Sequence, residues 1–166
     1  KRWYAHRYID ATDPSHSVTQ APPGTRSFLQ KLAADPETAH FVGAPSVFLS
    51  HAWSYRFRNV IAAMRSHVRA LPEGAPPPFF WFDVFSIDEH ATQALTQEWW
   101  STTFQDAIRS IGRTLMVLSP WDNPLPLTRA WCLWEMYCTV STGSEFSVCL
   151  GEAEEAALEA ALLRDP

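Results

Sequence analysis

Short, wholly apolar segments that alternate with amphipathic stretches constrain the fold of this chain more than any other feature. A strand that is apolar on both faces must be covered on both faces, as in a parallel sheet flanked by helices. Four such strands are predicted, at residues 47–49, 79–85, 115–118 and 146–150. Apolar residues at helical spacing predict helices at residues 58–71, 100–111 and 152–163. A further helix, which carries Glu135, is predicted to begin after Thr128 as its N-cap. We therefore predict an α/β fold with a flavodoxin-like parallel sheet and helices on both faces.

The start of this alternation suggests how the chain is divided. Residues 1–45 are an N-terminal extension of loop-like composition, with one short helix predicted at residues 25–34. Residues 46–166 are predicted to form a single α/β domain with four strand–helix units, so we expect a last, fifth unit to be missing. The chain starts at Lys1 without methionine, and we expect further domains in the full-length protein.

Charge and cysteine content argue against several classes of partner. The chain has 13 Lys and Arg against 18 Asp and Glu, a net charge of −5, which disfavours nucleic acid. Cys132, Cys138 and Cys149 form no CxxC pair, so a reducing, cytoplasmic setting is expected rather than a disulfide framework or a zinc site. No apolar run approaches the ~20 residues that span a bilayer, so no membrane partner is expected.

The segment WCLWE, which ends at Glu135, places a carboxylate in apolar surroundings. On a helix, Trp131 lies one turn before Glu135 on the same face, and Cys132 and Cys138 flank Glu135 three residues to either side. A carboxylate among an indole and two thiols is poorly hydrated. Glu135 is therefore expected either at the rim of a solvent pocket or in a special role.

The predicted topology indicates where a site would form. In an open parallel sheet, ligands bind beyond the carboxyl ends of the strands where the strand order reverses, here between the first and third strands. The loops at residues 51–56 and 119–127 leave those two strands, and the second of them leads into the helix with Glu135. The sequence thus predicts a site of aromatic rings and carboxylates: His51, Trp53, Asp83, Phe85, Trp131 and Glu135.

A single carboxylate limits the chemistry of such a site. The chain has no GxGxxG segment and no P-loop, so a dinucleotide would be held by stacking on rings and by hydrogen bonds to ribose. The nicotinamide of NAD+ leaves a cationic N-glycosidic bond as a neutral molecule, and no general acid is required. Stabilising the oxocarbenium-like ribose and holding its hydroxyls is a task for one Glu. An O-glycosidase would need a second carboxylate, and the sequence names no clear partner.

A metal site is the alternative raised by the residues themselves. His51, Asp83, Asp88 and His90 could gather around an ion. Their spacing follows no known ligand pattern, so no metal is expected.

Four segments in the same order resemble the TIR (Toll/interleukin-1 receptor) domain family: VFLSHAWSYRF at residues 47–57, FFWFDVF at 79–85, TLMVLSP at 114–120 and WCLWE at 131–135. A second likeness, to the fungal heterokaryon-incompatibility domain, lies in SHAW at residues 50–53 and WFDVFSID at 81–88. The TIR resemblance covers residues 46–150. It implies that Glu135 is the catalytic residue for NAD+ cleavage, and that Trp131, His51, Ala52 and Trp53 line the nucleotide pocket.

The resemblance implies an enzyme that acts on NAD+ as its substrate. The expected activity is hydrolysis to nicotinamide and ADP-ribose, or cyclisation to a cyclic ADP-ribose isomer, in immune or stress signalling. The expected partners are NAD+ or a related nucleotide and further copies of the chain, bound through TIR surfaces. The competing hypothesis is a TIR domain that serves only as a homotypic interaction module, without turnover.

Overall fold

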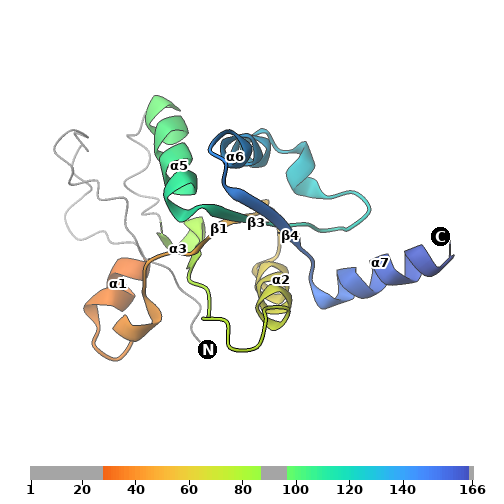
Figure 1. Cartoon of the computed structure of the whole chain (residues 1–166), viewed down its shortest axis with the longest axis horizontal. Helices are drawn as coiled ribbons and strands as arrows, with labels where there is room; N and C mark the ends of the chain where they lie inside the picture. Colours follow the sequence, from red (N-terminus) through yellow and green to blue (C-terminus); the bar gives the residue numbers. More distant parts are fainter. Residues whose placement is uncertain (1–27, 87–96, 165–166) are drawn as a thin grey trace.

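The computed structural model describes residues 28–86 and 97–164. Its centre is a sheet of four parallel strands in the order β2-β1-β3-β4 (Figure 1). The strands are β1 Val47–Ser50, β2 Phe80–Trp81, β3 Arg113–Val117 and β4 Glu145–Cys149. The predicted α/β fold with a flavodoxin-like parallel sheet is confirmed. Residues 1–27 of the predicted extension, together with Asp88 and His90, lie outside the described part.

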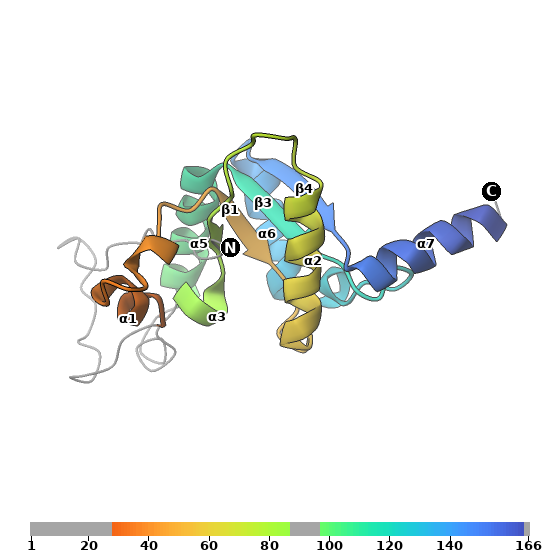
Figure 2. The same ribbon diagram turned by 90° about the horizontal axis from the view of Figure 1, so that it is seen from below.

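Helices cover both faces of the sheet (Figures 1 and 2). Helix α2 lies on one face, and α5 and α6 lie on the other. The helical elements are α1 Phe28–Ala34, η1 Ala39–Phe41, α2 Phe57–Arg69, α3 Asp83–Ser86, α5 Gln97–Ile111, η2 Leu125–Thr128, α6 Ala130–Ser141 and α7 Glu152–Arg164. None of these helices is long and apolar enough to cross a lipid bilayer.

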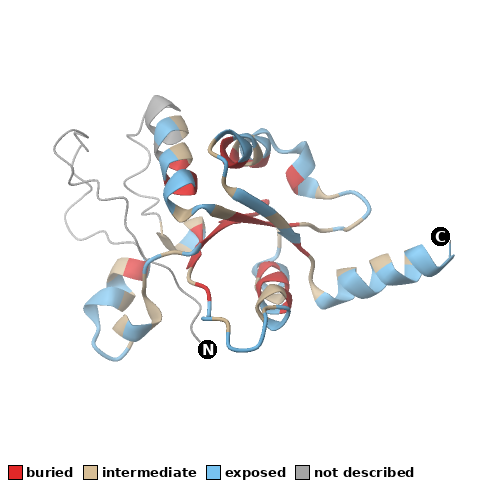
Figure 3. Ribbon diagram, in the orientation of Figure 1, coloured by how far each residue is buried: buried red, intermediate tan, exposed pale blue. Residues whose placement is uncertain are grey.

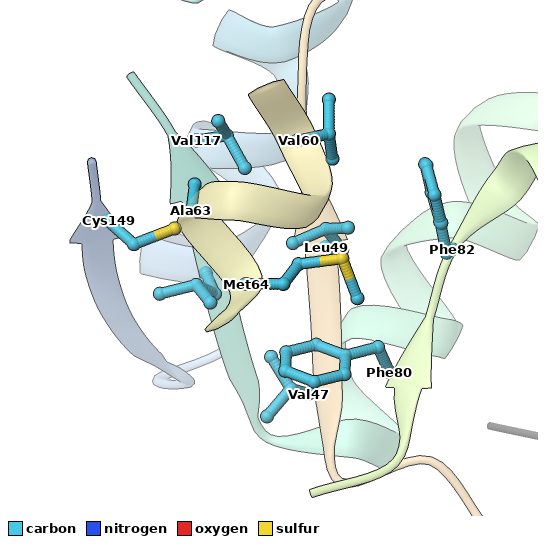
Figure 4. Close-up of a cluster of buried hydrophobic side chains, with 10 residues drawn as sticks. Val47, Leu49, Val60, Ala63, Met64, Phe80, Phe82, Val117 and Cys149 are labelled. Atoms are coloured by element: carbon cyan, nitrogen blue, oxygen red, sulfur yellow. The ribbon is translucent and has the colours of Figure 1, made fainter. Parts of the chain in front are cut away.

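Successive residues of β1 contribute to two separate hydrophobic cores, one on each face of the sheet. This is why Val47, Phe48 and Leu49 are all apolar. Val47 and Leu49 point toward α2, where they pack with Met64 and with Phe80 of β2 (Figure 4). Phe48 points to the opposite face, packs near α5 and α6, and stacks on Trp81 with ring centroids 4.7 Å apart. Burial of each such side chain contributes roughly 1.5–3 kcal/mol, so β1 is anchored from both sides.

Burial falls off sharply toward the end of the described chain (Figure 3). Strand β4 is at the edge of the sheet, and Phe146 and Val148 are exposed. Helix α7 has no buried residue, and its Leu162 and Leu163 are exposed. These elements leave apolar surface uncovered at this side of the molecule.

Among the predicted element boundaries, the end of the second strand and the N-cap of α6 differ most from the structure, for local reasons. The second strand ends at Trp81 rather than Phe85, because Asp83 begins helix α3 and accepts a hydrogen bond from the backbone N–H of Val84 at 2.8 Å. Thr128 is not the N-cap of α6: it ends η2, its hydroxyl donates to the backbone oxygen of Leu125, and Arg129 precedes α6. The polar side chains at both positions are engaged by nearby backbone instead of following the predicted pattern.

Candidate functional site

A buried carboxyl group lies at the point where the strand order reverses. Glu135 of α6 is only 5 % exposed, and its Oε2 accepts a hydrogen bond from the hydroxyl of Ser50 at 2.5 Å. Ser50 is the last residue of β1 and is fully buried. The carboxyl is therefore held beside the carboxyl end of the first strand, where the sequence predicted it.

Helix α6 directs Glu135 inward because its small and polar residues share one face. Cys132, Glu135, Cys138 and Thr139 are buried at spacings of three and four residues. The exposed large side chains of the helix are Trp131, Leu133, Tyr137 and Val140. The hydroxyl of Thr139 donates to the backbone oxygen of Glu135 at 2.7 Å and lies 2.8 Å from the hydroxyl of Thr114 on β3. These contacts fix the turn that carries Glu135 against the sheet.

The surroundings of Glu135 favour its protonated form. Burial raises the pKa of Glu135, the hydrogen bond from Ser50 lowers it, and the negative charge of Asp83 raises it; together these effects move the pKa from 4.5 to about 8. At neutral pH most molecules therefore carry Glu135 as the uncharged acid. A cationic ligand beside the group would favour ionisation.

A second polar group lies next to Glu135 and is centred on Asp83. The Oδ1 of Asp83 is 2.9 Å from the Nε2 of His51, and its Oδ2 accepts the indole N–H of Trp53 at 2.5 Å. His51 is buried and Asp83 is largely shielded, but Trp53 is 66 % exposed. Asp83 thus holds the nitrogen-bearing edge of the Trp53 indole, while most of this side chain is exposed to solvent.

Cys132 connects the two groups. Its thiol donates to the backbone oxygen of His51 at 3.5 Å. Burial, and then the charges of Glu135 and Asp83, raise the pKa of Cys132 to about 11, despite opposing effects from Ser50 and Arg129. The thiol is therefore uncharged at neutral pH, which argues against a nucleophilic role.

The two loops beside the reversal point are fastened to each other. Tyr55, in the loop after β1, donates to the backbone oxygen of Ser119 and accepts its backbone N–H at 2.9 Å. The hydroxyl of Ser119 donates to Oε1 of Glu154 at 2.8 Å, and the backbone N–H of Trp121 donates to Oε2 at 2.8 Å. This Tyr55–Ser119–Glu154 network joins the exits of β1 and β3 to the first turn of α7.

The predicted site residues are not all brought together. His51, Trp53, Asp83 and Glu135 lie in the two neighbouring groups described above. Ala52 is buried, and its backbone oxygen accepts the backbone N–H of Tyr55, so it shapes the loop.

The other two predicted residues lie at the margins. Phe85 packs against Phe28, Phe57 and Phe82, and only Phe82 of these rings meets His51, at 4.9 Å. Trp131 is exposed and lies edge-on against Phe104 of α5, with ring centroids 5.0 Å apart.

The sequence prediction did not assign Ser50 to the site. The signal that could have identified Ser50 is its position directly after an apolar segment, at the predicted reversal point of the sheet. Within residues 28–86 and 97–164, no group of three or more His, Cys, Asp or Glu side chains is placed to hold a metal ion.

No protein-family model, no curated protein and no solved structure matches the chain.

Proposed function

We propose that this chain is an NAD+ nucleosidase of the TIR type, which cleaves the bond between nicotinamide and ribose. The products are nicotinamide and either ADP-ribose or a cyclic isomer, with a role in immune or stress signalling. The observation that carries the proposal is the enclosed carboxyl of Glu135, held by Ser50 at the reversal point of the sheet. This is the position at which parallel α/β sheets bind ligands.

The chemistry requires one carboxylate and little else. Cleavage releases nicotinamide as a neutral molecule and leaves positive charge on the ribose, which the anion of Glu135 stabilises. The Oε2 of Glu135 accepts the Ser50 hydroxyl, and Oε1 has no hydrogen-bond partner among the residues that the structure describes. Oε1 is therefore the oxygen that the proposal assigns to the ribose.

The substrate itself favours the reactive form of Glu135. The nicotinamide ring of NAD+ is cationic, and a positive charge close to a carboxyl lowers its pKa. The exposed indole of Trp53, fixed by Asp83, offers a flat surface on which a base can stack. These two features supply binding contacts that do not depend on a glycine-rich phosphate loop.

The experiment that tests the proposal is an assay of nicotinamide release from NAD+ by wild type and the Glu135→Gln variant. We expect the variant to lose roughly 10²–10³-fold in kcat, because the stabilising charge is gone while the Ser50 hydroxyl keeps an acceptor. Glu73→Gln is the matched control, since Glu73 is exposed in the turn before β2, away from the Glu135 carboxyl. Lack of release by wild type at high protein concentration and with its partner regions present contradicts the proposal.

A second candidate function, a homotypic interaction module, is favoured by the exposed apolar residues of β4 and α6. Phe146 and Val148 on the edge strand are exposed, as are Tyr137 and Val140 on α6. Apolar residues on an open sheet edge are a common site of association. The test is whether Val148→Glu abolishes concentration-dependent self-association in light scattering while Glu135→Gln leaves it unchanged.

A further inference from the structure

The two carboxyl groups of the site have opposite environments. Three nitrogens, of His51, Trp53 and Val84, lie within hydrogen-bond distance of the oxygens of Asp83. The carboxyl of Glu135 receives one hydroxyl donor and is almost fully enclosed. The enclosure of Glu135 favours its protonated form.

The two groups are close enough to influence each other. The charge of Asp83 acts on Glu135 and raises its pKa, and Cys132 is affected by both carboxyls. When two carboxyls lie near one another, ionisation of one disfavours ionisation of the other.

The hydrogen bond from Ser50 determines which oxygen of Glu135 can act. Oε2 accepts the Ser50 hydroxyl, so the proton of the acid form is carried by Oε1. In the described part of the chain, Oε1 has no hydrogen-bond partner. A proton on Oε1 is thus not engaged by another residue of that part.

We propose that Glu135 also serves as a general acid, so that the site cleaves N-ribosides whose base is uncharged as well as cationic nicotinamide ribosides. This inference rests on the proposed function, because it assigns a second substrate class to the same site. The C1′–N bond breaks as the proton of Glu135 Oε1 passes to the nitrogen of the base. Water then adds to C1′ and returns one proton to Glu135, so the protein is regenerated and the net reaction is hydrolysis.

The test uses two 5′-phosphoribosides that differ in the charge of the base: nicotinamide mononucleotide, which is cationic, and adenosine 5′-monophosphate, whose base is uncharged. Base release by the full chain is measured as kcat/KM between pH 5.5 and pH 9.5, with NAD+ assayed in parallel. We expect kcat/KM for adenosine 5′-monophosphate to fall about tenfold per pH unit above roughly pH 8, where Glu135 loses its proton. For nicotinamide mononucleotide and NAD+ the dependence is the reverse, rising toward pH 8.

Three variants make the result specific. Glu135→Gln loses release of adenine from adenosine 5′-monophosphate by about 10²–10⁴-fold, the usual contribution of a general acid. Asp83→Asn removes a negative charge that adds to the effect of burial on the pKa of Glu135, so the falling limb moves to lower pH. Glu73→Gln, in an exposed turn, retains the wild-type profile. Far-UV circular dichroism and thermal unfolding verify that each variant is folded.

The outcomes separate this inference from the proposed function. Release of nicotinamide from NAD+ or its mononucleotide, with no adenine release above that of Glu135→Gln, overturns the inference and leaves the NAD+ activity standing. Adenine release that rises with pH also overturns the acid role of Glu135. If no substrate yields free base, both proposals fail.

Discussion

The buried acid at position 135 makes a quantitative prediction about stability. The pKa of Glu135 rises from 4.5 to about 8 on folding, so the folded protein binds this proton more tightly than the unfolded chain. The stability that this proton contributes is complete below pH 4.5 and is lost as the pH rises to about 8. At about 1.4 kcal/mol per pH unit, the complete effect is on the order of 5 kcal/mol, of which roughly 4 kcal/mol is lost between pH 5 and pH 9.

Glu135→Gln removes this dependence because an amide does not titrate in this range, while its oxygen still accepts the Ser50 hydroxyl. The free energy of unfolding of wild type and variant is measured by urea denaturation at each half unit from pH 5 to pH 9. The difference between the two curves isolates Glu135 from other groups, such as His67, whose pKa is lowered by burial and by the charge of Arg113. We expect the variant to gain relative stability steadily up to about pH 8 and then no further.

A flat difference curve refutes the reasoning, because it means that Glu135 is ionised at neutral pH in the folded protein. The reasoning is also refuted if the stability difference between wild type and variant changes only below pH 5. In either case Glu135 does not hold a proton at neutral pH, and the general-acid role proposed for it has no basis.

Three further predictions concern the same site and its support. Ser50→Ala leaves a buried carboxyl without its donor, so urea denaturation at pH 7 is expected to show a loss of about 1–3 kcal/mol; no loss contradicts the 2.5 Å contact. The kcat/KM for NAD+ is expected to rise with pH to about 8, while kcat levels off at lower pH because the bound cation favours the anion of Glu135; a pH-independent kcat/KM argues against an ionising Glu135. Phe48→Ala removes a fully buried ring that stacks on Trp81, and should lower the free energy of unfolding by about 3–5 kcal/mol; a loss below 1 kcal/mol contradicts the described packing.

The sheet was predictable because its cause is local. Val47, Phe48 and Leu49 are apolar at successive positions, and such a strand requires a cover on both faces. The reversal point then follows from the order of the strands, and with it the nearness of Glu135 to the end of β1. The second predicted helix also ends for a local reason, because Gly112 follows α5 with a φ of 76°, which glycine adopts readily.

The arrangement around Asp83 was not predictable in the same way. Residues 79–85 have the composition of a strand, but Asp83 accepts N–H groups from His51 and Trp53, which lie about thirty residues earlier in the chain. Neither periodicity nor propensity contains such distant contacts. The position of Trp131 is a similar case. Its spacing in the sequence predicted which face of the helix it lies on, but its contact with Phe104 depends on how α5 and α6 pack.

The weakly packed helix α7 is attached to the rest of the protein mainly by its first turn. Glu152 pairs with Arg69 of α2, and Glu154 binds Ser119 and Trp121, while no residue of α7 is buried. A displacement of the distal end of this helix would therefore act on Ser119 through Glu154, and on Tyr55 at the exit of β1 through Ser119. A molecule that binds α7 would thus be linked, through these hydrogen bonds, to the loops on either side of Glu135.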